Sequence, residues 1–281
     1  MKCIVCDNNN PHEAVYCSGC GQPLGTKGDV LPSTPSSAEP NQLRPLEFSS
    51  FLVQSATIYR NNFVYFITLS LIPQLPGILL SFGNVQDFRI ILPILLLFSP
   101  LYVLSSAASV MGISQYYLIG QMDIGYCFKR AWYKILSLYI AFMVFGLVLI
   151  GAGFLTIILI GLPLLLYLFT VWFFFVECIM LDRKGSLDSL WQSRDLVSGS
   201  FWRVFGIGLG FTSIIVLASV FAQVLVSTLM PNSHFVAIIF LSIVSIVILP
   251  IGWIGRTLVY YDLRVRKEDY AIDDLADSFH G

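Results

Sequence analysis

Four long stretches of this sequence contain no Lys, Arg, Asp or Glu, and they constrain the fold more than any other feature. An α-helix crosses the apolar core of a bilayer in about 20 residues, so each stretch is long enough for a crossing. The whole chain is 12% charged, against about 25% in a typical soluble domain. We therefore expect an all-α membrane bundle. The stretches are residues 61–86, 90–122, 135–176 and 204–255.

The third stretch is too long for one crossing, and glycine and proline clusters at 151–153 and 161–163 favour a tight turn within it. With six spans, the flanking basic residues, Arg256 among them, lie on the cytoplasmic side with both termini, and only Arg89 lies outside. The positive-inside rule favours this count and predicts a multi-pass protein of the inner membrane. The predicted spans are residues 63–82, 91–118, 135–156, 160–181, 204–229 and 235–258.

A short segment with apolar residues at positions i, i+3 and i+4 precedes each pair of spans, which predicts a one-sided helix there. Asp123 and Ser186 precede two of these segments, where a side-chain oxygen caps a helix start. We infer three units, each an interfacial helix followed by a two-helix hairpin; the alternative is that cytoplasmic loops share this composition. The apolar triplets are Phe48/Phe51/Leu52, Ile124/Cys127/Phe128 and Leu187/Leu190/Trp191.

Two CxxC pairs near the N-terminus predict a structural zinc site. Their four thiolates satisfy the tetrahedral preference of Zn²⁺ and leave no coordination position open for catalysis. The alternative, disulfides or a redox dithiol, is disfavoured in the reducing cytoplasm. His12 lies between the pairs and is expected at the surface. The predicted ligands are Cys3, Cys6, Cys17 and Cys20.

The sequence divides into four parts. Residues 1–24 form the predicted zinc ribbon, and residues 25–45 have the Pro/Ser-rich composition of a flexible linker. Residues 46–267 form the six-helix domain, and residues 268–281 form a cytoplasmic tail. Residues 1–45 carry more acidic than basic side chains, whereas phosphate binding requires the reverse. A cytoplasmic protein is therefore the expected partner of the ribbon, and nucleic acid is not.

A few polar residues interrupt the predicted spans. Glu177 is a candidate functional residue because an ionisable group in a span is costly; the alternative is that it reaches water or headgroups, since Asp182 follows five residues later. Gln74, Gln115 and Gln223 are candidates for an internal route, or else hydrogen-bond between helices.

Enzymatic activity is not expected. The sequence contains three histidines, at positions 12, 234 and 280, and none falls in the middle of a predicted span. A hydrolytic site inside the membrane requires a buried base or converging metal ligands.

Two stretches carry a family resemblance: residues 181–191 with Phe201-Trp202-Arg203, and the ending Tyr-Tyr-Asp-Leu-Arg-Val-Arg-Lys at 260–267. They resemble the prokaryotic six-helix family that includes the membrane domain of some glycerophosphodiester phosphodiesterases. The resemblance covers about residues 46–270 and implies a membrane module without the phosphodiesterase domain. Residues 1–24 resemble the short zinc ribbons found at the N-termini of prokaryotic membrane proteins.

These observations predict a non-enzymatic scaffold or anchor, embedded in the lipid bilayer, with a cytoplasmic zinc ribbon that binds a partner. The alternative is a permease that carries a small molecule or lipid through the interior of the bundle. A cavity deep in the bundle favours the permease, and a tightly packed core favours the scaffold.

Overall fold

The computed structural model describes residues 9, 46–83, 87–158, 161–229, 233–268, 270 and 274–276. The predicted zinc ribbon and linker, apart from residue 9, lie outside this part of the chain.

Within these described ranges, six helical segments are long and apolar enough to cross a membrane, which confirms the predicted multi-pass, all-α architecture of the membrane domain. A 3₁₀ turn (η1, Leu155–Ile158) follows the third segment, at the predicted turn. Gly161 is required there, because a Cβ at this position would lie 2.1 Å from the backbone nitrogen of Thr156. The segments are α2 (Phe63–Phe82), α3 (Phe88–Ile119), α5 (Ile135–Phe154), α6 (Gly161–Val171) with α7 (Phe175–Met180), α9 (Phe201–Leu229) and α10 (His234–Glu268).

A short helix precedes each pair of long segments, in the predicted order: α1 (Phe48–Asn61), α4 (Ile124–Tyr133) and α8 (Ser186–Val197). Asp123 caps α4 as expected, because its carboxylate accepts a hydrogen bond of 3.0 Å from the backbone N–H of Tyr126. The expected cap at Ser186 is wrong. Gly185 occupies the N-cap position, and Ser186 is already the first helical residue.

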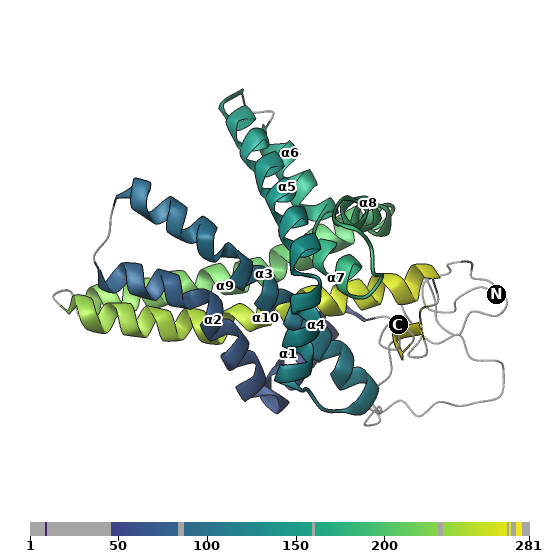
Figure 1. Cartoon of the computed structure of the whole chain (residues 1–281), viewed down its shortest axis with the longest axis horizontal. Coiled ribbons are helices and arrows are strands. Elements are labelled where there is room, and N and C mark those ends of the chain that lie inside the picture. Colours follow the sequence, from purple (N-terminus) through teal and green to yellow (C-terminus); the bar gives the residue numbers. More distant parts are fainter. Residues whose placement is uncertain are drawn as a thin grey trace.

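The helices are most densely packed at one end of the molecule. Residues 103–114 of α3 and all of α7 are buried, and so are residues 253–263 of α10 except Arg256. In contrast, only 17% of the residues in the most apolar stretch of α5 are buried inside the protein, and only 6% of those in the most apolar stretch of α10. Figure 1 shows the α5–α6 hairpin pointing away from α2, α9 and α10. The outward apolar surface suits contact with lipid, which is itself apolar.

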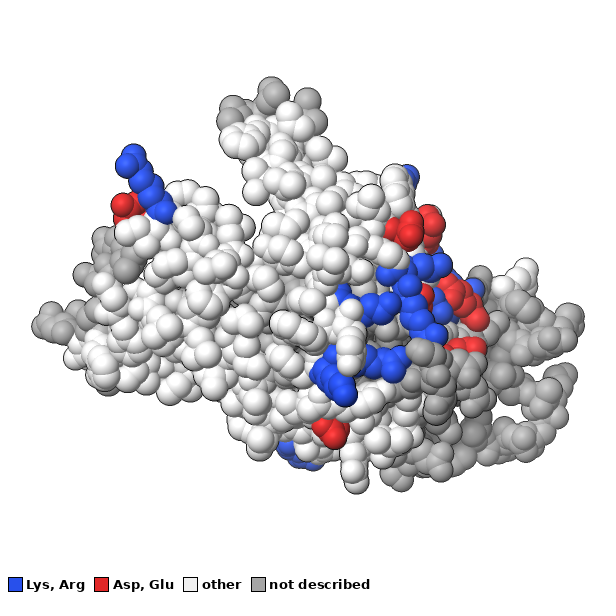
Figure 2. Space-filling model, viewed as in Figure 1, with Lys and Arg blue, Asp and Glu red and all other residues white. Residues whose placement is uncertain are grey.

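Charged residues gather at the packed end (Figure 2). Figure 2 also shows blue and red atoms at the opposite tip. The start of α3 carries two charged residues, Asp87 at the N-cap and Arg89 in the first turn. We call the packed, charged end the basic end. The gathering of charged residues at one end agrees with the sequence-based prediction that the basic residues flanking the spans lie on one side of the membrane.

The C-terminal half of α10 connects the helices of the basic end. Tyr260 donates a hydrogen bond of 2.9 Å to Asp182, after α7, and the hydroxyl of Tyr261 lies 2.5 Å from that of Ser114 on α3. Lys267 donates to the backbone carbonyls of Asp195 and Ser198 at the end of α8. Residues 260–267 therefore hold three other parts of the fold together.

The same part of α10 holds the chain at the entrance to α1. The buried carboxylate of Asp262 accepts from the backbone N–H of Leu46 at 2.7 Å, from Arg203 Nε at 3.1 Å and from Arg266 Nε at 2.9 Å. The carbonyl oxygen of Leu46 accepts from the same two arginines at 2.5 and 3.2 Å. We call Leu46, Arg203, Asp262 and Arg266 the Leu46 clamp.

Replacing Asp262 by Asn is expected to lower the free energy of unfolding by about 3–5 kcal/mol, because two arginines lose their buried counter-charge. The matched control is Glu268→Gln. The side chain of Glu268 is 47% exposed and pairs with Arg264 at i,i+4, so the expected loss is under about 0.5 kcal/mol. Unfolding of the full chain in mixed micelles measures both. Equal losses would contradict the clamp's structural role.

Candidate functional site

A buried ion pair joins the fourth and sixth spans. Arg256 Nε donates to Glu177 Oε1 at 2.7 Å, and the two side chains are 12% and 0% exposed, respectively. Thr257 Oγ1 donates to the same carboxylate oxygen at 3.3 Å. Arg256 Nη2 donates to Ser106 Oγ on α3 at 2.8 Å. The pair therefore links α3, α7 and α10 inside the protein.

This burial excludes one interpretation of Glu177. Glu177 does not reach water or headgroups, because α7 directs its carboxylate toward α10. Arg256, expected among the basic residues that flank the spans, lies at the basic end with only 12% of its side chain exposed. A sequence signal for the pair exists: Glu177 precedes Asp182 by five residues and Arg256 precedes Asp262 by six. Opposite charges at similar depths on neighbouring spans are candidates for pairing.

The fourth span is broken between α6 and α7, at residues 172–174. Ser193 of α8 enters the break: its hydroxyl donates to the carbonyl of Val171 at 2.8 Å and accepts from the backbone N–H of Phe174 at 3.1 Å. One side chain thus satisfies backbone groups that the interrupted helix leaves free. The sequence has no Gly or Pro at the break, so the pattern of breaker residues did not reveal it.

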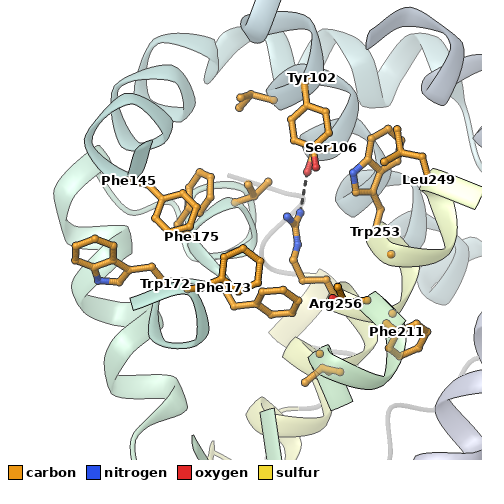
Figure 3. Close-up of a pocket in the computed structure, with 18 of the residues that line it drawn as sticks. Tyr102, Ser106, Phe145, Trp172, Phe173, Phe175, Phe211, Leu249, Trp253 and Arg256 are labelled. Atoms are coloured by element: carbon orange, nitrogen blue, oxygen red, sulfur yellow. Dashed lines mark hydrogen bonds between the residues drawn. The ribbon is translucent and has the colours of Figure 1, made fainter. Parts of the chain in front are cut away.

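A cavity of about 290 Å³ lies beside the ion pair, near the lower limit of known ligand pockets, roughly 300 Å³. Its walls come from α3, α5, α6, α7, α9 and α10, and nine of its twenty lining residues are aromatic. Figure 3 shows Arg256 extending between these rings toward Ser106. Tyr102 and Phe169 at the rim are 40% and 48% exposed and belong to spanning helices. The aromatic lining residues labelled in Figure 3 include Phe145, Trp172, Phe173, Phe175, Phe211 and Trp253.

Two polar atoms near this cavity lack hydrogen-bond partners in the described part of the chain: Trp253 Nε1 and Glu177 Oε2. Trp253 lines the cavity and is 3% exposed. Because an unpaired buried polar group costs about 1–3 kcal/mol, this wall offers a donor to a bound molecule. The Glu177–Arg256 pair is already neutral, so the site suits an uncharged or amphipathic molecule.

The predicted polar residues do not converge. Gln115 accepts from the backbone N–H of Asp123 at 2.8 Å and from the thiol of Cys127 at 3.3 Å, so it supports the turn between α3 and α4. Gln74 is half-buried on α2, and Gln223 is exposed on α9. None of the three glutamines lines the cavity beside Arg256.

The four predicted zinc ligands lie outside the described residues. Within the described ranges, no group of three or more His, Cys, Asp or Glu side chains could hold a metal ion. Cys127 and Cys178 are buried and make no disulfide. Burial raises the pKa of the Cys127 thiol on α4 to about 11, so this thiol is protonated at neutral pH.

Searches of protein-family models, curated proteins and solved structures find no match to this chain.

Substitutions in the ion pair are expected to be strongly coupled. Glu177→Gln or Arg256→Gln alone leaves a buried charge unpaired and is expected to lower the free energy of unfolding by about 3–5 kcal/mol. The double variant removes both charges and is expected to lose less than either single variant, as a double-mutant cycle in micelles measures. Additive losses would show that the two side chains do not interact.

Proposed function

We propose that this protein is a non-enzymatic membrane anchor that holds an N-terminal zinc ribbon at the cytoplasmic face of the inner membrane. The ribbon, formed by residues 1–24 with Cys3, Cys6, Cys17 and Cys20 as zinc ligands, contacts a cytoplasmic protein. The linker of residues 25–45 gives the ribbon reach. The bundle fixes the point at which the linker joins the membrane domain.

The Leu46 clamp is the observation that carries this proposal. Leu46 directly follows the predicted linker, and its backbone N–H and carbonyl are both held by charged side chains of α9 and α10. Asp262 is 1% exposed, so these interactions act in a low-dielectric environment where they are strong. The junction between the linker and the bundle is thus held by α9 and α10, and not only by its connection to α1.

The charge distribution supports the cytoplasmic orientation. The clamp belongs to the basic end, where Lys and Arg gather (Figure 2). Loops that stay in the cytoplasm carry an excess of these residues. The linker and ribbon therefore lie on the cytoplasmic side, where cysteine thiols remain reduced and can bind zinc.

Thiol counting tests the zinc ribbon in the full chain. Maleimide is expected to label few thiols of the zinc-loaded protein at neutral pH, because metal protects four cysteines and burial protects Cys127 and Cys178. A chelator should expose four thiols, and a denaturant two more. The control variant, Cys3→Ser with Cys17→Ser, should bind no zinc and keep the unfolding transition of the bundle. A chelator without effect on labelling would contradict the zinc ribbon.

A second candidate function, a permease for a small molecule or lipid, is favoured by one observation. The cavity beside Arg256 has a rim on spanning helices, and its Trp253 Nε1 donor lacks a hydrogen-bond partner among the residues that the structure describes. A permease must open this cavity alternately to both aqueous sides. An anchor requires no such opening.

Cysteine accessibility separates the two functions. Ser106 lines the cavity and is completely buried, so Ser106→Cys, in a variant lacking the other cysteines, reports whether water reaches this depth. In sealed vesicles, we expect a membrane-impermeant thiol reagent to label it from neither face. Labelling from both faces would contradict the anchor function and support the permease function. Labelling of a cysteine at Trp202, which is 79% exposed at the basic end of α9, verifies that the reagent is active.

A further inference from the structure

The cavity beside Arg256 opens through the side of the bundle. Its lining includes Tyr102 on α3, Phe169 on α6 and Thr212 on α9, which are all exposed at the protein surface. These three residues belong to segments that are long and apolar enough to cross a membrane. The outward surface of a spanning helix lies against acyl chains, and the bilayer core contains no water. A molecule dissolved in the bilayer therefore reaches the cavity without passing through water.

Aromatic side chains face each other across this cavity. On one side, the ring of Phe145 contacts those of Trp172 and Phe175, with centroids 6.1 and 5.7 Å apart. Trp253 lies on the other side, and Arg256 extends between the two sides (Figure 3). Aromatic rings are stabilised by contact with a further ring beyond what the burial of apolar area provides. The walls therefore favour a flat ring over a flexible acyl chain.

Two residues of the lining have hydrogen-bond donors available for a ligand. Trp253 Nε1 is buried and has no partner among the residues that the structure describes. Figure 3 shows this nitrogen on the edge of the indole that faces Ser106 and Arg256. Arg256 donates to Glu177 through Nε and to Ser106 through Nη2, and within the described ranges its Nη1 makes no hydrogen bond. A buried N–H without a partner is costly, so a ligand that accepts from it gains affinity.

These donors require a ligand that accepts hydrogen bonds without adding charge. Indole and guanidinium N–H groups donate and do not accept. Glu177 already pairs with Arg256 at 2.7 Å, and a further charge in this interior would lack a counter-charge and be costly. A carbonyl oxygen accepts and is uncharged. The cavity volume of about 290 Å³ limits the bound part to a compact group.

We infer that the cavity beside Arg256 binds a flat, uncharged, membrane-soluble ring compound that carries a carbonyl oxygen, as a quinone does. The carbonyl oxygen accepts from Trp253 Nε1 and Arg256 Nη1, and the ring packs between the aromatic walls. The compound enters from the lipid, past Tyr102 and Phe169. This binding requires no opening to either aqueous side, so it does not depend on the permease function. It is also independent of the zinc ribbon and of the Leu46 clamp.

Equilibrium dialysis of the full chain in micelles, against micelles without protein, tests the ligand class. The probe is duroquinone, whose fully substituted ring does not add to cysteine thiols, and the matched control is durene, the same methylated ring without carbonyl oxygens. We expect saturable duroquinone binding and at least about fivefold weaker durene binding, the effect of one net hydrogen bond. Trp253→Phe keeps a ring but removes the donor, so it should weaken duroquinone binding about fivefold and leave durene binding unchanged. Equal affinity for the two compounds would overturn the proposal.

Two glycines of α9 test the location of the site. Gly208 lines the cavity, and a Cβ there would meet Phe173 Cζ at an ordinary contact distance of 3.9 Å. Gly208→Leu is therefore expected to fill the cavity and abolish saturable duroquinone binding. The matched control is Gly206→Leu on the same helix, where a Cβ meets no described atom within 4 Å and which does not line the cavity; it should keep full affinity.

Duroquinone binding that persists in Gly208→Leu, or that both leucine variants lose equally, would overturn the proposal. Thermal unfolding of the two variants without ligand shows whether both bundles are folded. Because these substitutions leave every cysteine in place, zinc content is measured on the same samples. Failure of duroquinone binding with zinc retained would leave the anchor function untouched.

Discussion

The pairing of buried charges determines how this fold is assembled. The second half of α10 brings Arg256, Asp262 and Arg264 into the protein interior, where an isolated charge costs several kcal/mol. Each of these residues has a charged partner on another helix or in the turn after α7. The partners Glu177, Asp182 and Arg203 come from parts of the chain distant in sequence. Their positions are therefore fixed by electrostatics as much as by apolar packing.

Two different environments result within one chain. At the basic end, short helices and the ends of the long helices form a conventional buried core. Toward the other end, the hairpins keep most of their apolar side chains on the outside. Lipid provides no driving force for apolar surfaces to associate with one another. Close packing is therefore found where charges and hydrogen bonds require it, and it is sparse elsewhere.

The six spans and the three short helices could be predicted from the sequence because apolar length and helical periodicity are local properties. The cap at Asp123 followed from the same local chemistry, whereas that at Ser186 did not, since Gly185 occupies the cap position. The break after α6 could not be predicted, because it depends on a serine from α8 that is close only in three dimensions. For the same reason, Glu177 was identified as a candidate without Arg256.

The sparse contacts at the outer ends of the hairpins affect how the protein responds to its solvent. Bilayers differ in hydrophobic thickness by several ångströms, and a helix adjusts to such mismatch by tilting. The α5–α6 hairpin points away from α2, α9 and α10 (Figure 1), and the ion pairs of α10 lie at the other end of the molecule, so a change in the tilt of its outer end does not involve them. The same molecule can therefore fit a thinner or a thicker membrane while the surface of its basic end keeps one shape.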